Sequence, residues 1–348
     1  MHILSTGPVC TSRWIKRVRV ISESTFTVQG HGVHSAYLDT IQAISQMDDV
    51  EMVSGMRSLG TSVILHAHTI GPTALVRMLI HRGYRIVNAH ITPASFVGSI
   101  ICARPLLGLV GRYMRFVYNR ADSVIAVSQA TATELAELKV RRPITVSHNA
   151  IDSQPILDLL SQRFELRGVL GWHRDVVVLA VGQIQPRKGV EEFLECAAAL
   201  PRMRFVWVGG TQFGLLSAGR RGLRQSCAMA PNNVRFVGML PRPDVFRYYA
   251  AADAFFLPLR QETFGLAALE AAMAGLPLVL RDLDCYREWL GRAYLSGTTI
   301  KEYVSLLRQL EDPGIRRALG AQAGLAASKH GRQALITGLR DAYDMAVR

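Results

Sequence analysis

Acidic residues are scarce in this sequence. Its 348 residues include 27 Asp and Glu against 40 Lys and Arg, which gives a formal net charge of +13. Such an excess argues against a cationic partner. It favours an anionic one, such as nucleotide phosphates, nucleic acid or an acidic membrane surface.

Cysteines and long apolar runs are also few. The five cysteines are scattered and form no CxxC pair, which argues against a disulfide framework and a zinc site and favours a reduced, intracellular protein. No stretch reaches the roughly 18 uncharged apolar residues that a membrane-spanning helix needs. The opening residues MHILSTGPVCTSRW have too short an apolar run for a signal peptide.

Short β-branched runs, in contrast, recur along the whole chain and alternate with helical patterns. Examples are SVILHAHT, RIVNAHIT, VVVLAVGQI and RFVWVGG. Runs without polar alternation are typical of parallel sheets that are covered by helices on both faces. We therefore predict an α/β fold with doubly wound, Rossmann-like parallel sheets.

The runs fall into two sets, separated by a polar helical stretch over 154–172. We predict an N-terminal domain over 1–160 and a C-terminal domain over 161–330. A last helix, over about 331–348, lies beyond the second set and is expected to pack back on the first domain. Ligands of such folds bind beyond the carboxyl ends of the strands, so the expected site is the cleft between the domains.

Two cations mark the first candidate site, VGQIQPRKGVEEF. A strand ends near Gly182, a turn carries Arg187 and Lys188, and Gly189 opens a helix. Unpaired amides and the helix dipole at such a turn favour a phosphate group. A solvated basic turn is the alternative.

A second candidate is the stretch RQETFGLAALEAAMAG. Glu262 follows an apolar strand, and Glu270 lies within an apolar helical run that begins near Leu266. A buried carboxylate needs a partner, and carboxylates are good acceptors for sugar hydroxyls. The alternative is that Glu270 forms a salt bridge with one of the many arginines.

The segment ETFGLAALE resembles the E-x7-E signature of the retaining glycosyltransferases of family 4, which have the two-domain GT-B fold. The turn GQIQPRKG, the strand RFVWVGG, and the segments ADSVIAVSQATATELAEL and SHNAID match the family in order and spacing. The resemblance extends over most of the chain, so it does not depend on a lone motif.

The resemblance implies a role for each matching residue. Glu270 would bind the ribose hydroxyls of a nucleotide, and Glu262 the hydroxyls of the donor sugar. Arg187 and Lys188 would stabilise the diphosphate as it leaves, and His90 would lie beside the transferred sugar; these two cations, His90 and Glu262 would be the catalytic residues. Backbone groups would complete the nucleotide-sugar site at Gly30, Gly32, Gly238, Met239, Leu240, Phe264, Gly265 and Leu266.

The resemblance also implies the reaction: a hexosyltransferase that retains configuration and moves a hexose, with UDP-glucose the expected donor. The segments HAHTIGP and LPLVLRDLDCYREWL are similar to a bacterial subgroup that glycosylates diacylglycerol. We therefore expect a membrane lipid as acceptor and a cytoplasmic protein on the inner face of the cell membrane. A polysaccharide or lipid-linked oligosaccharide acceptor is the alternative.

A basic nucleic-acid-binding protein is a third possibility, but no RNA-recognition or zinc-finger pattern supports it, so nucleic acid is not an expected partner. We also expect no cofactor and no metal. His66 and His68 share one strand face but lack a third ligand. Asp282 and Asp284 match a metal-binding D-x-D only by its three-residue spacing.

The stretch PLLGLVGRYMRFVYN, over 105–119, predicts a basic amphipathic helix. Its apolar residues fall on one broad face, and Arg112 and Arg115 lie beside that face. Such a helix can lie in the interface of an anionic membrane. It can equally be a core-facing helix with a solvated basic edge.

Overall fold

The computed structural model describes residues 15–24, 32–54, 63–93, 103–210 and 220–346. Within these ranges the strands form two six-stranded sheets. Neighbouring strands in each sheet are parallel. The first sheet has the order β2 (Val50–Met52), β1 (Lys16–Ile21), β3 (Val63–Ala67), β4 (Arg85–Ala89), β5 (Ser123–Ala126) and β6 (Ile144–Val146). The second has the order β12 (Leu295–Gly297), β11 (Leu278–Arg281), β10 (Ala254–Leu257), β7 (Val176–Val181), β8 (Met203–Val208) and β9 (Val234–Gly238).

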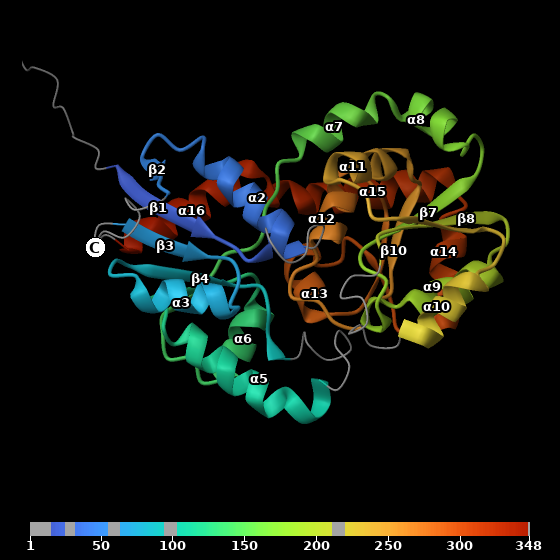
Figure 1. Cartoon of the computed structure of the whole chain (residues 1–348). Helices are drawn as coiled ribbons and strands as arrows, with labels where there is room; N and C mark the ends of the chain where they lie inside the picture. The colour runs from blue at the N-terminus through green and yellow to red at the C-terminus, as the bar shows by residue number, and fades with distance from the viewer. Residues whose placement is uncertain (1–14, 25–31, 55–62, 94–102, 211–219, 347–348) are drawn as a thin grey trace, which may run out of the picture.

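Helices surround each sheet, as Figure 1 shows. Those from the first part of the chain are α2 (Gly32–Ile44), α3 (Pro72–Ile80), α5 (Ala103–Tyr118) and α6 (Gln129–Glu137), followed by the connecting helices α7 (Gln154–Leu160) and α8 (Arg163–Leu170). Those of the second part are α9 (Val190–Ala199), α10 (Arg220–Ala228), α11 (Arg242–Ala251), α12 (Leu266–Met273), α13 (Asp284–Leu290), α14 (Ile300–Gln309) and α15 (Pro313–Ala327). The predicted fold class, with two Rossmann-like parallel α/β sheets, is confirmed.

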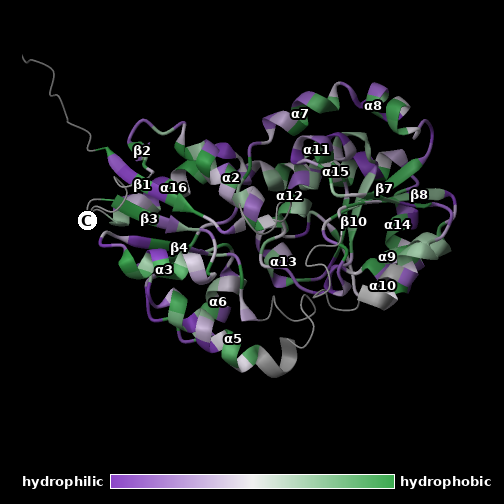
Figure 2. Cartoon of the chain, viewed as in Figure 1, coloured by the Kyte–Doolittle hydropathy of each residue, from purple (hydrophilic) through white to green (hydrophobic). Residues whose placement is uncertain are grey.

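The central strands are buried on both faces, which explains their continuous apolar sequences. Residues 254–257 of β10 and 63–67 of β3 are buried throughout, and Figure 2 shows apolar residues along the strands of both sheets. Removing this apolar surface from water is the main favourable term in folding. None of the helices in the described ranges combines the length and apolarity needed to cross a bilayer.

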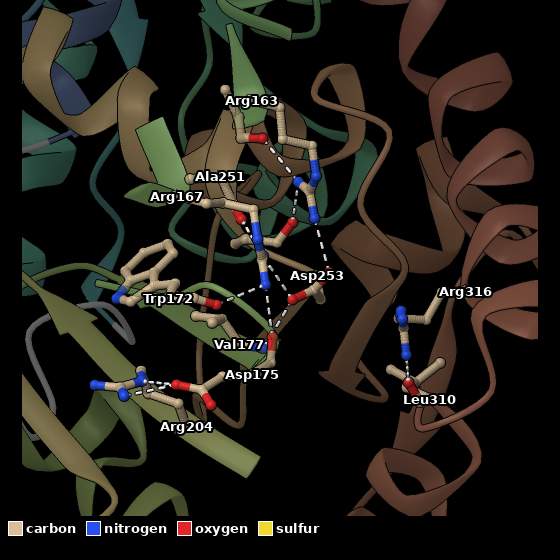
Figure 3. Close-up of polar contacts among 12 residues, drawn as sticks. Arg163, Arg167, Trp172, Asp175, Val177, Arg204, Ala251, Asp253, Leu310 and Arg316 are labelled. Atoms are coloured by element: carbon tan, nitrogen blue, oxygen red, sulfur yellow. Dashed lines mark hydrogen bonds and ion pairs between the residues drawn. The ribbon is translucent and has the colours of Figure 1, made fainter. Parts of the chain in front are cut away.

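An arginine pair fastens α8 to the amino-terminal ends of the central strands β7 and β10 (Figure 3). Arg163 and Arg167 each bind one oxygen of Asp253, at 2.7 and 2.9 Å. Asp253 Oδ2 also accepts a hydrogen bond from the backbone N–H of Val177, at 2.9 Å. These bonds hold the connecting segment against the start of β7.

The last helix, α16 (Arg332–Ala346), packs on the first sheet. Its residues Ile336 and Leu339 are buried in one cluster with Val18 and Ile64. The Tyr343 hydroxyl is hydrogen-bonded to Nδ1 of His66 on β3, at 2.9 Å. The chain therefore returns to the first sheet after it has completed the second.

Candidate active site

The carboxyl ends of β7, β8 and β9 meet at one edge of the second sheet. The Gly209 N–H donates to the Gly238 carbonyl at 2.8 Å, and the Ile184 N–H donates to the Gly210 carbonyl at 3.0 Å. The turn Gly238, Met239 and Leu240, predicted to lie at the edge of the base, is thus beside the end of β8. The Met239 side chain is 55% exposed there.

The turn after β7 carries Arg187 and Lys188 on a short 3₁₀ helix, Pro186–Lys188. Gly189 follows with φ +74°, and a Cβ at this position would lie 2.4 Å from the carbonyl oxygen of Pro258. Only glycine tolerates this conformation and this approach. The close contact holds the cationic turn against the end of β10, where the segment with Glu262 begins.

Lys188 and Glu262 form an ion pair in this position, with Nζ 2.8 Å from Oε2. Burial alone would raise the pKa of Glu262, but the charges of Lys188 and Arg187 outweigh it and hold the pKa below its ordinary value. Burial lowers the pKa of Lys188, and Glu262 opposes that effect. The pair is therefore two opposite charges at the carboxyl edge of the sheet, with a second cation beside them.

Helix α12 begins at Leu266, four residues after Glu262. Gly265 has φ +94°, and a Cβ there would lie 2.5 Å from the ring of Tyr286. The Phe264 ring is 1% exposed and stacks on Trp289 at 5.7 Å. The side chain of Phe264 thus belongs to the core, so this residue can meet a ligand through its backbone amide.

Two predicted residues of the first domain approach this helix start. The Thr263 hydroxyl donates to the carbonyl of His90 at 3.4 Å. A Cβ built on Gly32, at the start of α2, would lie 3.8 Å from Cδ1 of Leu266. Gly30 lies outside the described residues.

His66 on β3 and His68 just after it lie close to His90: the rings of His66 and His68 are 4.7 Å apart, and His68 is hydrogen-bonded to His90. Nδ1 of His68 is 3.2 Å from Nε2 of His90, and Nε2 of His66 is 3.0 Å from Oδ1 of Asn88. Burial lowers the pKa of His66 to about 4 and that of His68 well below its ordinary value. His66 and His68 are therefore neutral at pH 7, and the ring of His68 stacks on that of His90 with centroids 5.3 Å apart.

The two aspartates of the D-x-D spacing have structural partners. Asp282 and Asp284 both form ion pairs with Arg287 on α13. Asp282 also accepts a hydrogen bond from the Tyr294 hydroxyl, at 3.2 Å. The two carboxylates therefore bind neighbouring side chains at the surface of the second domain.

Glu270 lies on α12 and is 6% exposed. Nε and Nη2 of Arg242 lie 3.0 and 2.9 Å from its Oε1. The alternative reading of Glu270, a salt bridge with an arginine, is therefore realised in the structure. The same guanidinium binds Asp39 on α2, with Nη1 2.7 Å from Oδ1.

Asp39, Arg242 and Glu288 are residues of this region that the sequence patterns did not single out. Glu288 on α13 accepts hydrogen bonds from the backbone N–H of Gln129 at 2.8 Å, and it lies 2.6 Å from Nε2 of His148. Each contact joins the two halves of the chain. The one available signal was the lone acidic residue in the apolar helix run GVHSAYLDTIQAI.

Two protein families match this chain. Residues 50–154 match Glycosyltransferase Family 4, and residues 175–310 match Glycosyl transferases group 1. Together the two matches extend over more than half of the chain, and they fall on the first and second sheets in turn.

Curated relatives and solved structures agree with these matches. Alpha-galactosylglucosyldiacylglycerol synthase of Streptococcus pneumoniae is 28% identical over 336 residues, which are 94% of this chain and 89% of the relative. Processive diacylglycerol alpha-glucosyltransferase of Acholeplasma laidlawii is 28% identical over 214 residues, 59% of this chain and 61% of the relative. Anabaena HepE, solved in complex with UDP and glucose, superimposes with a TM-score of 0.74 at 19% identity over 95% of this chain and 99% of that chain.

The site geometry, the two family matches and the shared fold lead to one assignment. The two relatives are named as diacylglycerol glycosyltransferases, and HepE shares the fold with its two parallel sheets. The chain belongs to glycosyltransferase family 4 and is a hexosyltransferase of the GT-B fold.

Proposed function

We propose that this enzyme transfers a hexose from a nucleotide sugar to diacylglycerol or a glycosylated diacylglycerol, with retention of configuration. The observation that carries the proposal is the meeting of Lys188, Glu262 and the start of α12 with the His90 segment. It provides cations, a carboxylate and helix amides within one small region. A sugar diphosphate needs each of these groups.

Each candidate residue has a role in this proposal. Arg187 and Lys188 bind the diphosphate, and the amides at 264–266 bind it from the helix N-terminus. Glu262 accepts hydrogen bonds from the sugar hydroxyls, and His90 lies beside the transferred sugar. Glu270 binds the ribose hydroxyls, while the turn 238–240 and the glycine loop with Gly30 and Gly32 contact the rest of the donor.

The chemical step needs no nucleophile from the protein. The acceptor hydroxyl oxygen bonds to C1 of the sugar on the face from which the diphosphate leaves, and the bond from C1 to the phosphate oxygen breaks. The hydroxyl proton passes to the departing phosphate. Arg187 and Lys188 stabilise the negative charge that develops there, and the site holds the reactants in position.

A diacylglycerol acceptor is supported by the two curated relatives, whose names describe diacylglycerol glycosyltransferases. UDP as the nucleotide is consistent with HepE, which shares the fold and was solved with UDP. The decisive experiment offers radiolabelled UDP-, GDP- and ADP-hexoses with diacylglycerol in lipid vesicles. We expect labelled glycolipid with a UDP-sugar; no turnover with any donor, or transfer to soluble glycans alone, contradicts the proposal.

Helix α5 is the proposed contact with an anionic membrane surface. Leu109 and Phe116 are 62% and 43% exposed on it, and Arg112 is exposed beside them. A hollow of about 350 Å³ at its end is lined by Arg115, Asn119, Arg141 and Arg142. Apolar side chains beside cations suit an interface of acyl chains and acidic headgroups.

Vesicle co-sedimentation tests this surface. We expect binding to vesicles that contain phosphatidylglycerol, weaker binding to neutral vesicles, and loss of binding in high salt. The double variant Leu109→Ser with Phe116→Ser should reduce binding, whereas Leu325→Ser, at a residue 73% exposed on α15, should not. If both variants bind vesicles equally well, the membrane contact lies on another surface of the protein.

A further inference from the structure

Arg242 connects two buried carboxylates from different domains. It is the first residue of α11, shortly after the turn 238–240. Its Nη1 binds Asp39 of α2 at 2.7 Å, and its Nη2 binds Glu270 of α12 at 2.9 Å. One side chain thus touches the proposed ribose-binding residue and the opposite domain.

The three residues are too deeply placed for an ordinary surface ion pair. The exposed fractions of Asp39 and Glu270 are both 6%, and that of the Arg242 side chain is 22%. Two buried carboxylates repel each other, and the guanidinium between them offsets that repulsion. Loss of the arginine would leave both carboxylates without their shared cation.

Stability alone does not explain this arrangement. Oδ2 of Asp39 is buried and has no hydrogen-bond partner among the described residues, although nearly all buried polar atoms in proteins have one. Burial raises the pKa of Asp39 to about 6 even though Arg242 opposes that rise. A buried carboxylate whose ionised form is unfavourable calls for a functional explanation.

The geometry at Glu270 is compatible with a bound ribose. Both guanidinium bonds fall on Oε1, so the arginine does not occupy Oε2, the second acceptor that a diol can use. A planar fork with two bonds also restricts rotation of the carboxylate. The Tyr249 hydroxyl also contacts the Glu270 carboxylate. Arg242 can therefore orient Glu270 without binding both of its oxygens.

We propose that Arg242 is a positioning residue that orients Glu270 for the nucleotide ribose and, through Asp39, holds the two domains in the relative position that transfer needs. The inference rests on the proposed role of Glu270. It adds that nucleotide affinity depends on the bond between Arg242 and Glu270. Transfer, which needs both domains, depends on the bond between Arg242 and Asp39 as well.

The test measures the Kd of UDP by calorimetry, and KM and kcat for the UDP-sugar. Arg242→Gln should weaken UDP binding by about tenfold or more, because a charge-assisted bond to Glu270 is lost. Arg242→Lys keeps the charge without the fork and should recover part of that loss. Asp39→Asn should leave the Kd of UDP within about twofold and lower kcat by about threefold to tenfold, since it weakens only the interdomain bond.

Arg247→Gln is the matched control. Arg247 lies on the same helix and pairs with Asp244 at 3.1 Å, but its side chain is 59% exposed; we expect no change in Kd or kcat. Thermal unfolding of each variant separates a folding defect from a binding defect, and Arg242→Lys keeps the test available if Arg242→Gln does not fold.

Two outcomes overturn the inference. Unchanged UDP affinity in both Arg242 variants shows that Glu270 needs no positioning, and tighter affinity shows that Arg242 competes with the ribose. The role of Glu270 itself is tested separately by Glu270→Gln. Normal UDP binding in that variant contradicts the proposed site, whereas weakened binding there with unaffected Arg242 variants contradicts only the inference.

Discussion

Lys188 and Glu262 form an ion pair at 2.8 Å although 74 positions separate them in the chain. Two parallel strands of the second sheet, β7 and β10, bring their following turns to the same edge. Glu262 therefore lies beside the proposed diphosphate cations before any ligand is bound. This relationship supplies the first prediction.

Replacing Lys188 with Gln should lower kcat by about 100-fold to 1,000-fold, because a positioned cation on the leaving group is lost. The Kd of UDP should rise less than kcat falls, since Arg187 remains. Initial rates with a UDP-sugar and calorimetry with UDP provide the two numbers. Lys301→Gln, at an exposed position of α14, is the control, and wild-type kcat in Lys188→Gln would rule out the proposed role.

The two glutamates should separate binding from transfer. Glu270→Ala should weaken UDP binding by about 2 kcal/mol, because the ribose loses a charged acceptor. Glu262→Ala should reduce transfer far more than UDP affinity, since its proposed partner is the sugar. Glu195→Ala, at an exposed residue of α9, should change neither quantity. Full activity in both glutamate variants would contradict this interpretation of the helix.

Asp39 should make stability depend on pH in a defined direction. Its pKa is raised from 3.8 to about 6 in the folded protein, so the folded state holds this proton more tightly than the unfolded state. The group therefore lowers stability as pH rises through the window from about 4 to 6, and Asp39→Asn removes that effect. The unfolding free energy of the variant minus that of wild type should therefore rise by about 2 kcal/mol from pH 4.5 to pH 7.5.

Urea unfolding of wild type and Asp39→Asn at both pH values checks this expectation. The comparison of two proteins that differ at one position cancels the titration of all other groups. If the variant and wild type differ in unfolding free energy by the same amount at pH 4.5 and at pH 7.5, Asp39 titrates near its ordinary pKa.

Asp49 should behave in the opposite way. Burial would raise its pKa, but the bonds from Lys16 and Arg340 outweigh it and lower the pKa from 3.8 to about 2. A lowered pKa contributes stability that is present above about pH 4 and is lost as pH falls through the folded value. Asp49→Asn should thus cost about 2 kcal/mol at pH 7.

The neighbouring strand supplies the control for Asp49. Glu51 pairs with Arg17 at 3.8 Å, and its side chain is 59% exposed, so Glu51→Gln should cost less than about 0.5 kcal/mol. Because Arg340 belongs to α16, Asp49→Asn should also expose that helix to faster amide exchange. Equal stabilities of the two variants would show that the Asp49 pairs contribute little.

Several features could be predicted from local sequence alone. Strands buried on both faces have continuous apolar sequences, so the parallel α/β class followed from periodicity. Gly189 and Gly265 stand at left-handed positions, and the seven residues between the two glutamates of ETFGLAALE match the signature of family 4. These signals are local because backbone conformation and strand burial leave their mark on neighbouring residues.

The sequence, in contrast, did not reveal which charged residues pair with each other. Forty basic residues offered Glu270 many possible partners, and only the folded chain selects Arg242. That choice depends on α2, α11 and α12, which come from separate parts of the sequence and meet between the domains. Side-chain pairing across such distances is set by helix packing, and no short-range pattern encodes it.

The sequence by itself determined the fold class, because strand burial leaves a local periodicity. Its resemblance to known motifs indicated the family and the candidate residues of the donor site. Tertiary structure alone decided that Lys188 meets Glu262 and that Arg242 is shared by Glu270 and Asp39. It also decided that His66 and His68 are buried and neutral. The physical reason is that charge, burial and pKa depend on the neighbours in space, which the fold brings together from distant parts of the chain.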